Sequence, residues 1–153
     1  MIQRIQTVFL IIATILLAFM LFMPIAEVVR PMDEAVFGLG FNGLKSAEGA
    51  GTILSSYPLS ILIALCLTLC IVTIFLFKKR MLQIRLSVAN SILLLGLQGL
   101  AFYYVKSAET VLEGDGSYTL IFTFPLVSAI LVFLALRAIA RDEALVRSLN
   151  RLR

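Results

Sequence analysis

The chain has 153 residues and a mass of 16.9 kDa, enough for one domain. Apolar residues make up 61% of it, charged residues 14%, and the mean hydropathy is +1.04, whereas soluble domains are about half apolar and about a quarter charged. A chain this short cannot hide so much apolar surface from water, so the composition excludes a soluble enzyme, a nucleic-acid-binding protein and a disordered chain, and predicts an integral membrane protein.

Four apolar runs predict an all-α membrane protein, a bundle of four transmembrane helices. Each run is about 20 residues long, which at 1.5 Å per residue matches a hydrocarbon core of about 30 Å. None contains Asp, Glu, Lys or Arg. The predicted helices are residues 7–25, 57–77, 86–104 and 118–136, with outer loops 26–56 and 105–117 and a tail, residues 137–153. Residues 1–153 are predicted to form a single membrane domain.

The charged residues predict the orientation of these helices. Ten of the 13 basic residues fall in the N-terminal segment, the loop between the second and third helices, and the tail, whereas seven of the nine acidic residues fall in the other two loops. Positively charged loops stay on the cytoplasmic side, so both termini are predicted to be cytoplasmic. The first run is predicted to be a retained helix and not a cleaved signal peptide, because Pro24 stands at the candidate cleavage site.

The two outer loops carry strand and turn signals. Residues 36–41 alternate large apolar side chains with glycine, which predicts a strand with its apolar residues on one face. Residues 27–31 predict a second short strand, and Gly114-Asp115-Gly116 predicts a tight hairpin. Because an isolated hairpin is marginally stable, both loops are expected to pair into one small extracytoplasmic β cap, which either closes the bundle or binds a partner or ligand.

The third helix is predicted to carry a polar stripe. Four side chains fall within an arc of about 100° when the residues are placed on a helix: Ser87, Asn90, Ser91 and Gln98. Because an unpaired amide in lipid costs several kcal/mol, this stripe is expected to face the bundle or a partner. It predicts either hydrogen bonds between helices or a polar cleft for a lipid headgroup or quinone, centred on Asn90 and Gln98.

Chemistry-bearing residues are few. Cys66 and Cys70 lie one helical turn apart in a chain without histidine, so a metal site lacks ligands and a disulfide lacks the right geometry. They are predicted to be small buried apolar residues, and no metal or other cofactor is expected. The spans hold no nucleophile with a base and no paired acids, which predicts no enzyme activity and no catalytic residues. Pro125 predicts a kink in the fourth helix.

The tail is predicted to be an amphipathic cytoplasmic helix. An apolar stripe at helical spacing is made by Leu145, Val146, Leu149 and Leu152, with basic residues around it: Arg137, Arg141, Arg147 and Arg151. Two interpretations stay open. Either the helix lies in the interface with its arginines on anionic headgroups, or it docks on a cytoplasmic partner.

The opening Met1-Ile-Gln-Arg-Ile-Gln-Thr7 and the tail, residues 137–153, resemble a bacterial family known only as domain of unknown function 4293. The resemblance covers essentially the whole chain and implies a small protein of the cytoplasmic (inner) membrane of bacteria with two membranes. It implies no activity, and it departs at Asn150, where the family pattern has Asp. The layout is also similar to that of claudin-like proteins, whose loop tryptophan and cysteines this chain lacks, so that likeness is one of architecture.

The expected function is that of a non-enzymatic accessory or scaffold subunit of a larger membrane assembly. Its β cap and basic tail would be the contact surfaces, its partners membrane lipids and a membrane protein or a second copy, and no nucleic acid is expected. The alternative is a lipid- or quinone-binding protein that uses the polar stripe. A small oligomeric transporter ranks third, because the spans lack the ionisable residue that coupled transport uses.

Overall fold

Four long helices form the body of the molecule. The computed structural model describes residues 3–32, 34–46, 52–77 and 79–151, with side chains described within residues 5–145. The helices are α1 (Gln3–Phe22), α2 (Tyr57–Phe75), α3 (Arg80–Leu112) and α4 (Phe124–Arg151), and a short 3₁₀ helix, η1 (Leu120–Thr123), precedes α4. In the described part of the chain all four helices are long and apolar enough to cross a membrane, which confirms the predicted count.

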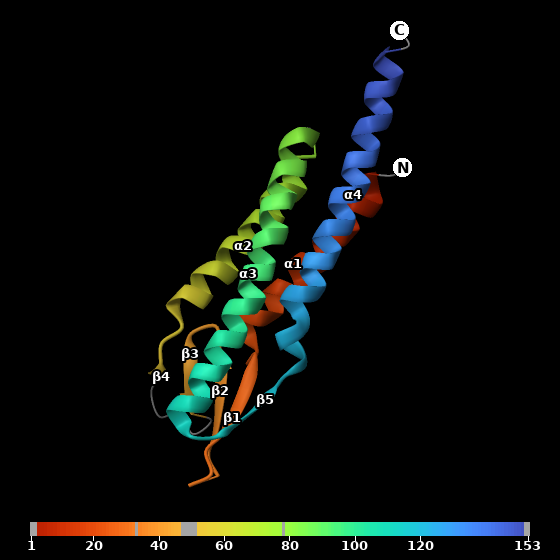
Figure 1. Cartoon of the computed structure of the whole chain (residues 1–153). Coiled ribbons are helices and arrows are strands. Elements are labelled where there is room, and N and C mark those ends of the chain that lie inside the picture. The colour runs from red at the N-terminus through yellow and green to blue at the C-terminus, as the bar shows by residue number, and fades with distance from the viewer. Residues whose placement is uncertain (1–2, 33, 47–51, 78, 152–153) are drawn as a thin grey trace.

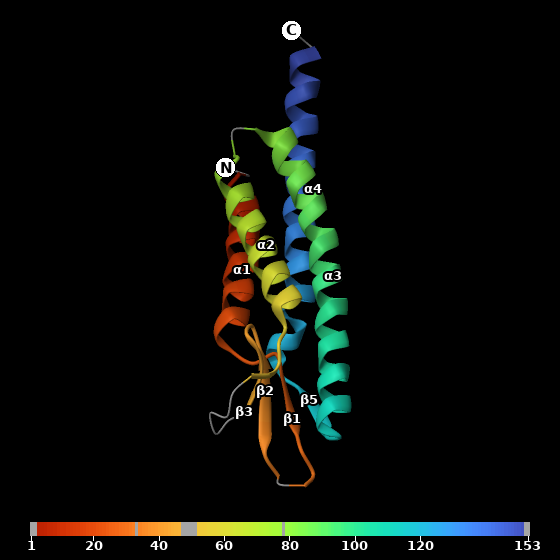
Figure 2. The same ribbon diagram turned by 90° about the vertical axis from the view of Figure 1, so that its left-hand side faces the viewer.

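The helices pack as a ring in chain order. α1 contacts α2 and α4, and α3 contacts the same two helices. The N-terminus, the turn between α2 and α3 and the C-terminal end of α4 lie toward one end of the bundle, called here the tail end (Figure 1). The strands gather at the opposite end, the sheet end, where α1 stops and α2 begins (Figure 2).

The bundle core is built from inward residues three or four positions apart. On α1 these are Leu10, Ala13, Leu17 and Met20, all fully buried. Yet only 28% to 33% of the residues in each candidate span are buried inside the molecule, and outward residues such as Ile92 and Phe133 are 65% and 55% exposed. An apolar surface this large is typical of a surface that contacts a membrane or a partner, in agreement with the apolar composition.

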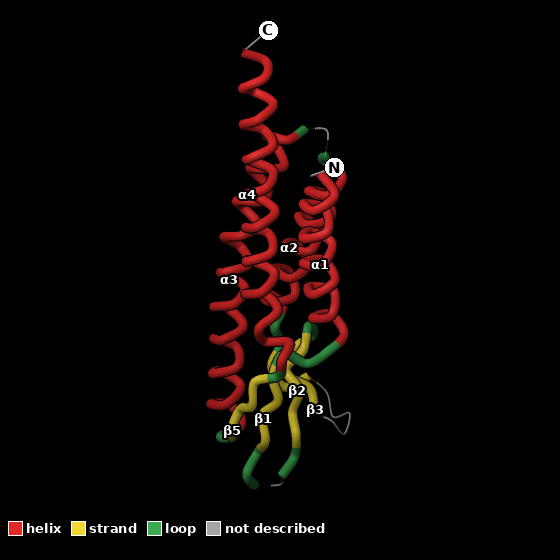
Figure 3. The backbone as a smooth tube through the Cα atoms, turned by 90° about the vertical axis from the view of Figure 1, so that its right-hand side faces the viewer, coloured by secondary structure: helices red, strands yellow, loops and turns green. Residues whose placement is uncertain are grey.

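In the described part of the chain the sheet end carries five antiparallel strands in the order β4-β3-β2-β1-β5. Figure 3 labels β5, β1, β2 and β3 of this sheet side by side. The strands are β1 (Ala26–Val29), β2 (Val36–Gly40), β3 (Gly43–Ser46), β4 (Thr52–Leu54) and β5 (Asp115–Tyr118). The first four come from the segment between α1 and α2, and β5 comes from the segment before α4. The prediction that both loops pair into one sheet is therefore confirmed.

One face of the sheet packs on the end of α3. The alternation of β1 and β2 buries Val28, Phe37 and Leu39 against Val105 and Leu112 of α3, and these residues form a second apolar core. Phe37 and Leu39 share the buried face, as predicted. The sheet is thus fastened to the helix as well as to its own strands.

The third helix is much longer than predicted. It was expected to cover residues 86–104, but it runs from Arg80 to Leu112, 33 residues and about 50 Å. Hydropathy marks the length of a bilayer, and a helix can continue beyond that length. Beyond residue 104 the sheet covers the apolar side of α3, and most of the predicted loop 105–117 is helix.

The predicted hairpin at residues 114–116 is wrong. Glu113 ends α3 in the left-handed conformation, with φ of 47°, and the chain passes directly into β5, which pairs with β1 over Val29↔Asp115 to Ala26↔Tyr118. Gly114 is required here because a Cβ atom would lie 2.2 Å from the carbonyl oxygen of Val29. The glycine signal marked a close approach of two backbones, not a turn between two neighbouring strands.

Pro125 lies in the first turn of the fourth helix, not in its interior, where a kink was predicted. It stands second in α4, where a helical N–H has no intrahelical acceptor to lose, and the residues before it form η1. The prediction that the fourth helix starts at residue 118 is therefore wrong, because residues 115–118 form strand β5 and the α-helix begins at Phe124.

The tail is helical, as predicted, but it is not a separate element. α4 runs without a break from Phe124 to Arg151, and its C-terminal turns extend past every other described element (Figures 1 and 2). A continuous helix keeps its direction, so the tail projects from the bundle along the axis of α4.

Candidate functional site

The predicted polar stripe of α3 faces the interior of the bundle. Ser87 is completely buried and Asn90 is 1% exposed, and both stand in the line of inward residues that continues with Leu94, Leu97 and Ala101. Ser91 and Gln98 are half-buried at the border of that line. The stripe therefore borders the neighbouring helices, one of the two settings that the sequence predicted.

The stripe is only partly satisfied by hydrogen bonds. The Asn90 amide donates from Nδ2 to Cys70 Sγ of α2 over 3.0 Å, and Ser91 Oγ donates to the Ser87 carbonyl over 2.9 Å. Three buried atoms have no hydrogen-bond partner in the described part of the chain: Ser87 Oγ, Asn90 Oδ1 and Gln98 Oε1. Each unpaired buried polar atom costs about 1–3 kcal/mol, so their presence needs an explanation.

The unpaired atoms fall into two groups. Ser87 and Asn90 are three residues apart, within one helical turn, whereas Gln98 lies eight residues beyond Asn90, about 12 Å along the axis. A cleft centred on both Asn90 and Gln98 would have to span more than two turns. The geometry favours Ser87 and Asn90 as the compact part of the stripe.

Gln83 extends the polar line toward the tail end. It is 5% exposed and donates from Nε2 to the Thr73 carbonyl of α2 over 3.2 Å. Gln83 lies before residue 86, where the predicted third helix begins, so the predicted stripe does not include it. Its position one turn before Ser87 was the available signal.

A second buried polar contact joins α1 to α4 at the tail end. Gln6 and Asp142 are 5% and 8% exposed, and Gln6 Nε2 donates to Asp142 Oδ2 over 2.5 Å. The carboxylate lies near the N-terminal end of α1, where the helix dipole favours negative charge. Asp142 was assigned to the tail, although it continues the inward line of Val132, Ala135 and Ile139 on α4, a spacing visible in the sequence.

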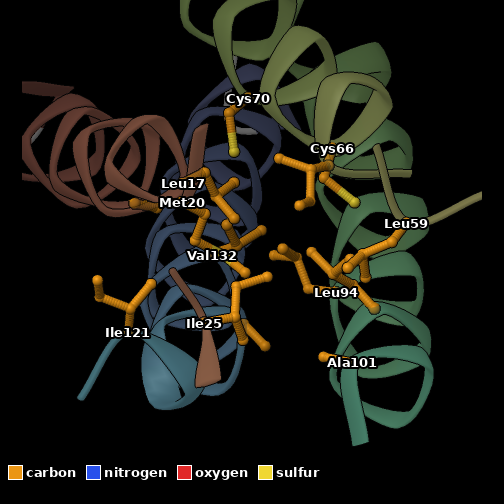
Figure 4. Close-up of a cluster of buried hydrophobic side chains, with 14 of the residues drawn as sticks. Leu17, Met20, Ile25, Leu59, Cys66, Cys70, Leu94, Ala101, Ile121 and Val132 are labelled. Atoms are coloured by element: carbon orange, nitrogen blue, oxygen red, sulfur yellow. The ribbon is translucent and has the colours of Figure 1, made fainter. Parts of the chain in front are cut away.

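The two cysteines lie inside the bundle, as predicted. Cys66 and Cys70 are buried and free, and Figure 4 places them with Leu17, Leu94 and Val132 in the core between the helices. Cys70 additionally accepts the Asn90 hydrogen bond. Among the described residues no group of three His, Cys, Asp or Glu side chains could hold a metal ion.

Two of the four predicted arginine contacts can be placed. Arg137 and Arg141 are exposed on α4, where they can reach a partner or headgroups. Arg147 and Arg151 belong to the same helix, but their side chains, with those of Val146 and Leu149, lie outside the described residues. Leu152 and Arg153 lie outside the described chain altogether.

A comparison with protein families finds one description for this chain. The family described as Domain of unknown function (DUF4293) matches residues 2–152, nearly the whole chain. No curated protein matches the sequence.

Proposed function

The chain belongs to the domain of unknown function 4293 family, and we propose that it works as a non-enzymatic accessory or scaffold subunit of a larger membrane assembly. The observation that carries this proposal is the helical extension of α4. From residue 143 to Arg151 this helix continues about 13 Å beyond the contact between Gln6 and Asp142, past every other described element (Figure 1).

An unbroken helix of this kind suits a docking element. In water, isolated helices shorter than about 12–15 residues are marginal, but here the spanning part of α4 serves as the nucleus for the extension. The sequence gives the extension one apolar stripe and several arginines, a combination typical of a helix that lies in the groove of a partner. The partner proposed is therefore a protein with an apolar groove and an acidic rim.

The proposed location is the bacterial inner membrane, with both termini in the cytoplasm. The three segments that hold ten of the 13 basic residues lie toward one end of the bundle, and such segments are retained on the cytoplasmic side. The sheet would then be extracytoplasmic. Cysteine labelling from either side of sealed vesicles, at Ser117 of β5 and at Arg141, would test this orientation.

The experiment for the scaffold role is a mild-detergent pull-down of the tagged chain from its native membrane, followed by intact-complex mass spectrometry. We expect a stoichiometric protein partner with the full chain and none with a chain that ends at Leu145. A matched variant, Leu149→Gln with Leu152→Gln, keeps every arginine and should also lose the partner. An unaccompanied monomer, or a partner that survives truncation, would contradict the proposal.

A second candidate function rests on the unpaired atoms of α3. Among the described residues, neither Ser87 Oγ nor Asn90 Oδ1 has a hydrogen-bond partner. A lipid headgroup or quinone inserted between helices could supply hydrogen bonds to both. If they bind nothing, Ser87→Ala removes an unsatisfied hydroxyl and should leave stability unchanged or raise it by up to about 1 kcal/mol. If they bind a ligand, the same variant should lose a small molecule that native mass spectrometry detects on the wild-type chain.

A further inference from the structure

A groove lies where α1 ends against the sheet. Its volume is about 240 Å³; one wall is the end of α1, from Leu21 to Pro24, and the other is the β2–β3 hairpin, from Gly38 to Lys45. The groove is remote from the polar stripe of α3 and from the tail. What occupies it is therefore a question independent of the proposed scaffold role.

The floor of this groove is glycine backbone. β2 turns Phe37 and Leu39 toward α3, so the open face of the strand shows Gly38 and Gly40. At Gly40 a Cβ atom would meet nothing within 4 Å, and at Gly38 it would meet only Pro24 Cβ, at 3.4 Å. Because neither glycine has a side chain, a ligand can approach the strand closely.

Charge lies beside the glycines. In the β2–β3 register Gly38 is opposite Lys45, so the exposed lysine projects from the open face of the sheet next to the floor of the groove. At the α1 end the groove is apolar: Phe22 is 84% exposed and Met23 is 48% exposed. One end therefore suits an anion and the other suits hydrocarbon.

The β2–β3 hairpin is attached to the end of the helix bundle. The Ser60 hydroxyl donates to the Phe41 carbonyl, and the Phe41 side chain packs against the bundle core. Lys45 is two residues further along β3 than Gly43, about 7 Å along the strand. In a membrane whose hydrocarbon core ends at the turn between β2 and β3, the headgroup layer is about 5–8 Å thick and would surround the ammonium group of Lys45.

We propose that this groove binds one phospholipid from the leaflet on the sheet side. The phosphate contacts Lys45 and lies over Gly38 and Gly40, and an acyl chain lies along Phe22 and Met23. A lipid is favoured over a free anion because a lipid can contact both ends of the groove. Its phosphate can contact Lys45 and its acyl chain can cover the exposed Phe22, whereas a free anion can contact only Lys45.

The decisive variant fills the floor of the groove. Gly40→Val adds a side chain where space is open and where a β-branched residue favours a strand, so the fold is expected to persist. The full chain, purified and delipidated in mild detergent, is titrated with dioleoyl phosphatidylglycerol and followed by native mass spectrometry. We expect one tightly bound lipid on the wild-type chain and none on Gly40→Val.

Charge variants test the phosphate contact and remain informative if Gly40→Val does not fold. Lys45→Ala should weaken the bound lipid about fivefold. Lys106→Ala removes an equal charge at the same end of the molecule, from a residue that instead pairs with Glu109 over 2.6 Å, and should leave lipid binding unchanged. Ser87→Ala, which tests the interior of the bundle, should also leave it unchanged.

Three results would overturn the proposal. Equal binding of the lipid by Gly40→Val and the wild-type chain would place the lipid elsewhere. Equal affinity for dioleoylglycerol, which has no phosphate, would remove the role of Lys45. Displacement of the lipid by millimolar inorganic phosphate would identify a free anion as the occupant.

Discussion

The two ends of the bundle each carry a helix that continues beyond its apolar run, and the surroundings of the two extensions differ. At the sheet end α3 continues through Val105, Ala108 and Leu112, which are buried under the strands in a core of their own. At the tail end α4 continues past the contact between Asp142 and Gln6 to Arg151. There Leu145 is 51% exposed, and the C-terminal turns of the helix extend past the other described elements (Figure 1).

The two ends of the bundle differ in how they join the helices. Strand β1 pairs with β2, which comes from the segment between α1 and α2, and with β5, which comes from the segment before α4. The sheet therefore holds together the segments at the ends of α1, α2, α3 and α4. The C-terminal turns of α4 instead project from the bundle (Figure 1). In the proposed scaffold role, the sheet end would hold the bundle together and the projecting helix would dock on the partner.

The largest expected effect comes from opening the sheet-end core. Leu39→Ala should lower the free energy of unfolding by about 2–5 kcal/mol, because Leu39 is completely buried between β2 and α3. Denaturation in mixed micelles measures this, with Ile92→Ala as the control, since Ile92 is 65% exposed on the lipid side. Equal losses in the two variants would mean that the sheet core does not stabilise the end of α3.

A backbone variant sharpens the same point. Gly114→Ala should cost about 1–3 kcal/mol, because the added Cβ would lie 2.2 Å from the Val29 carbonyl oxygen where α3 passes into β5. Gly99→Ala is the matched control: its Cβ meets nothing within 4 Å, and helix propensity predicts a gain of up to about 1 kcal/mol. If Gly114→Ala left the free energy of unfolding unchanged, β5 would not pair closely with β1.

At the tail end the Gln6–Asp142 contact gives an effect of intermediate size. Asp142→Ala should cost about 1–3 kcal/mol, because it leaves the Gln6 amide buried without its acceptor. Asp142→Asn keeps an acceptor oxygen in place and should cost clearly less. If both variants were equally damaging, negative charge near the start of α1, and not the hydrogen bond, would be the stabilising factor.

The smallest effect is expected beyond that contact. The free energy of unfolding of a chain that ends at Leu145 should differ from that of the full chain by no more than about 0.5 kcal/mol, as is usual for surface changes. The same micelle denaturation would record it beside Leu39→Ala. If truncation lowered the free energy of unfolding as much as Leu39→Ala, the tail would pack on the bundle and the two ends would not differ as described.

The sequence predicted what the bilayer dictates. The number of apolar helices, the buried cysteines and a sheet built from both loops all follow from hydropathy, helical spacing and strand alternation, and the structure confirms them. The polar stripe was expected to face the bundle or a partner, and the structure buries Ser87 and Asn90 inside the bundle. These patterns are local, and each is read within a few turns or one strand.

The sequence-based predictions were wrong where contacts between distant segments of the chain determine the local structure. The end of α3 at Leu112 depends on the sheet that covers it, the role of Gly114 depends on the backbone of Val29, and the burial of Asp142 depends on α1. Hydropathy also hid Gln83 and Asp142 from the candidate site, since polar residues outside an apolar run were assigned to loops and tail. The inward spacing on α3 and α4 carried the correct signal.

The most direct measurement is hydrogen–deuterium exchange of the backbone amides, on the purified chain and on the chain still in its native assembly. Residues 105–112 of α3 should exchange slowly in both samples, and residues 146–151 of α4 should exchange fast in the purified chain and slowly in the assembly. Equally fast exchange of the tail in both samples would contradict a docking role for α4. Fast exchange of residues 105–112 would contradict the covered sheet end on which that role depends.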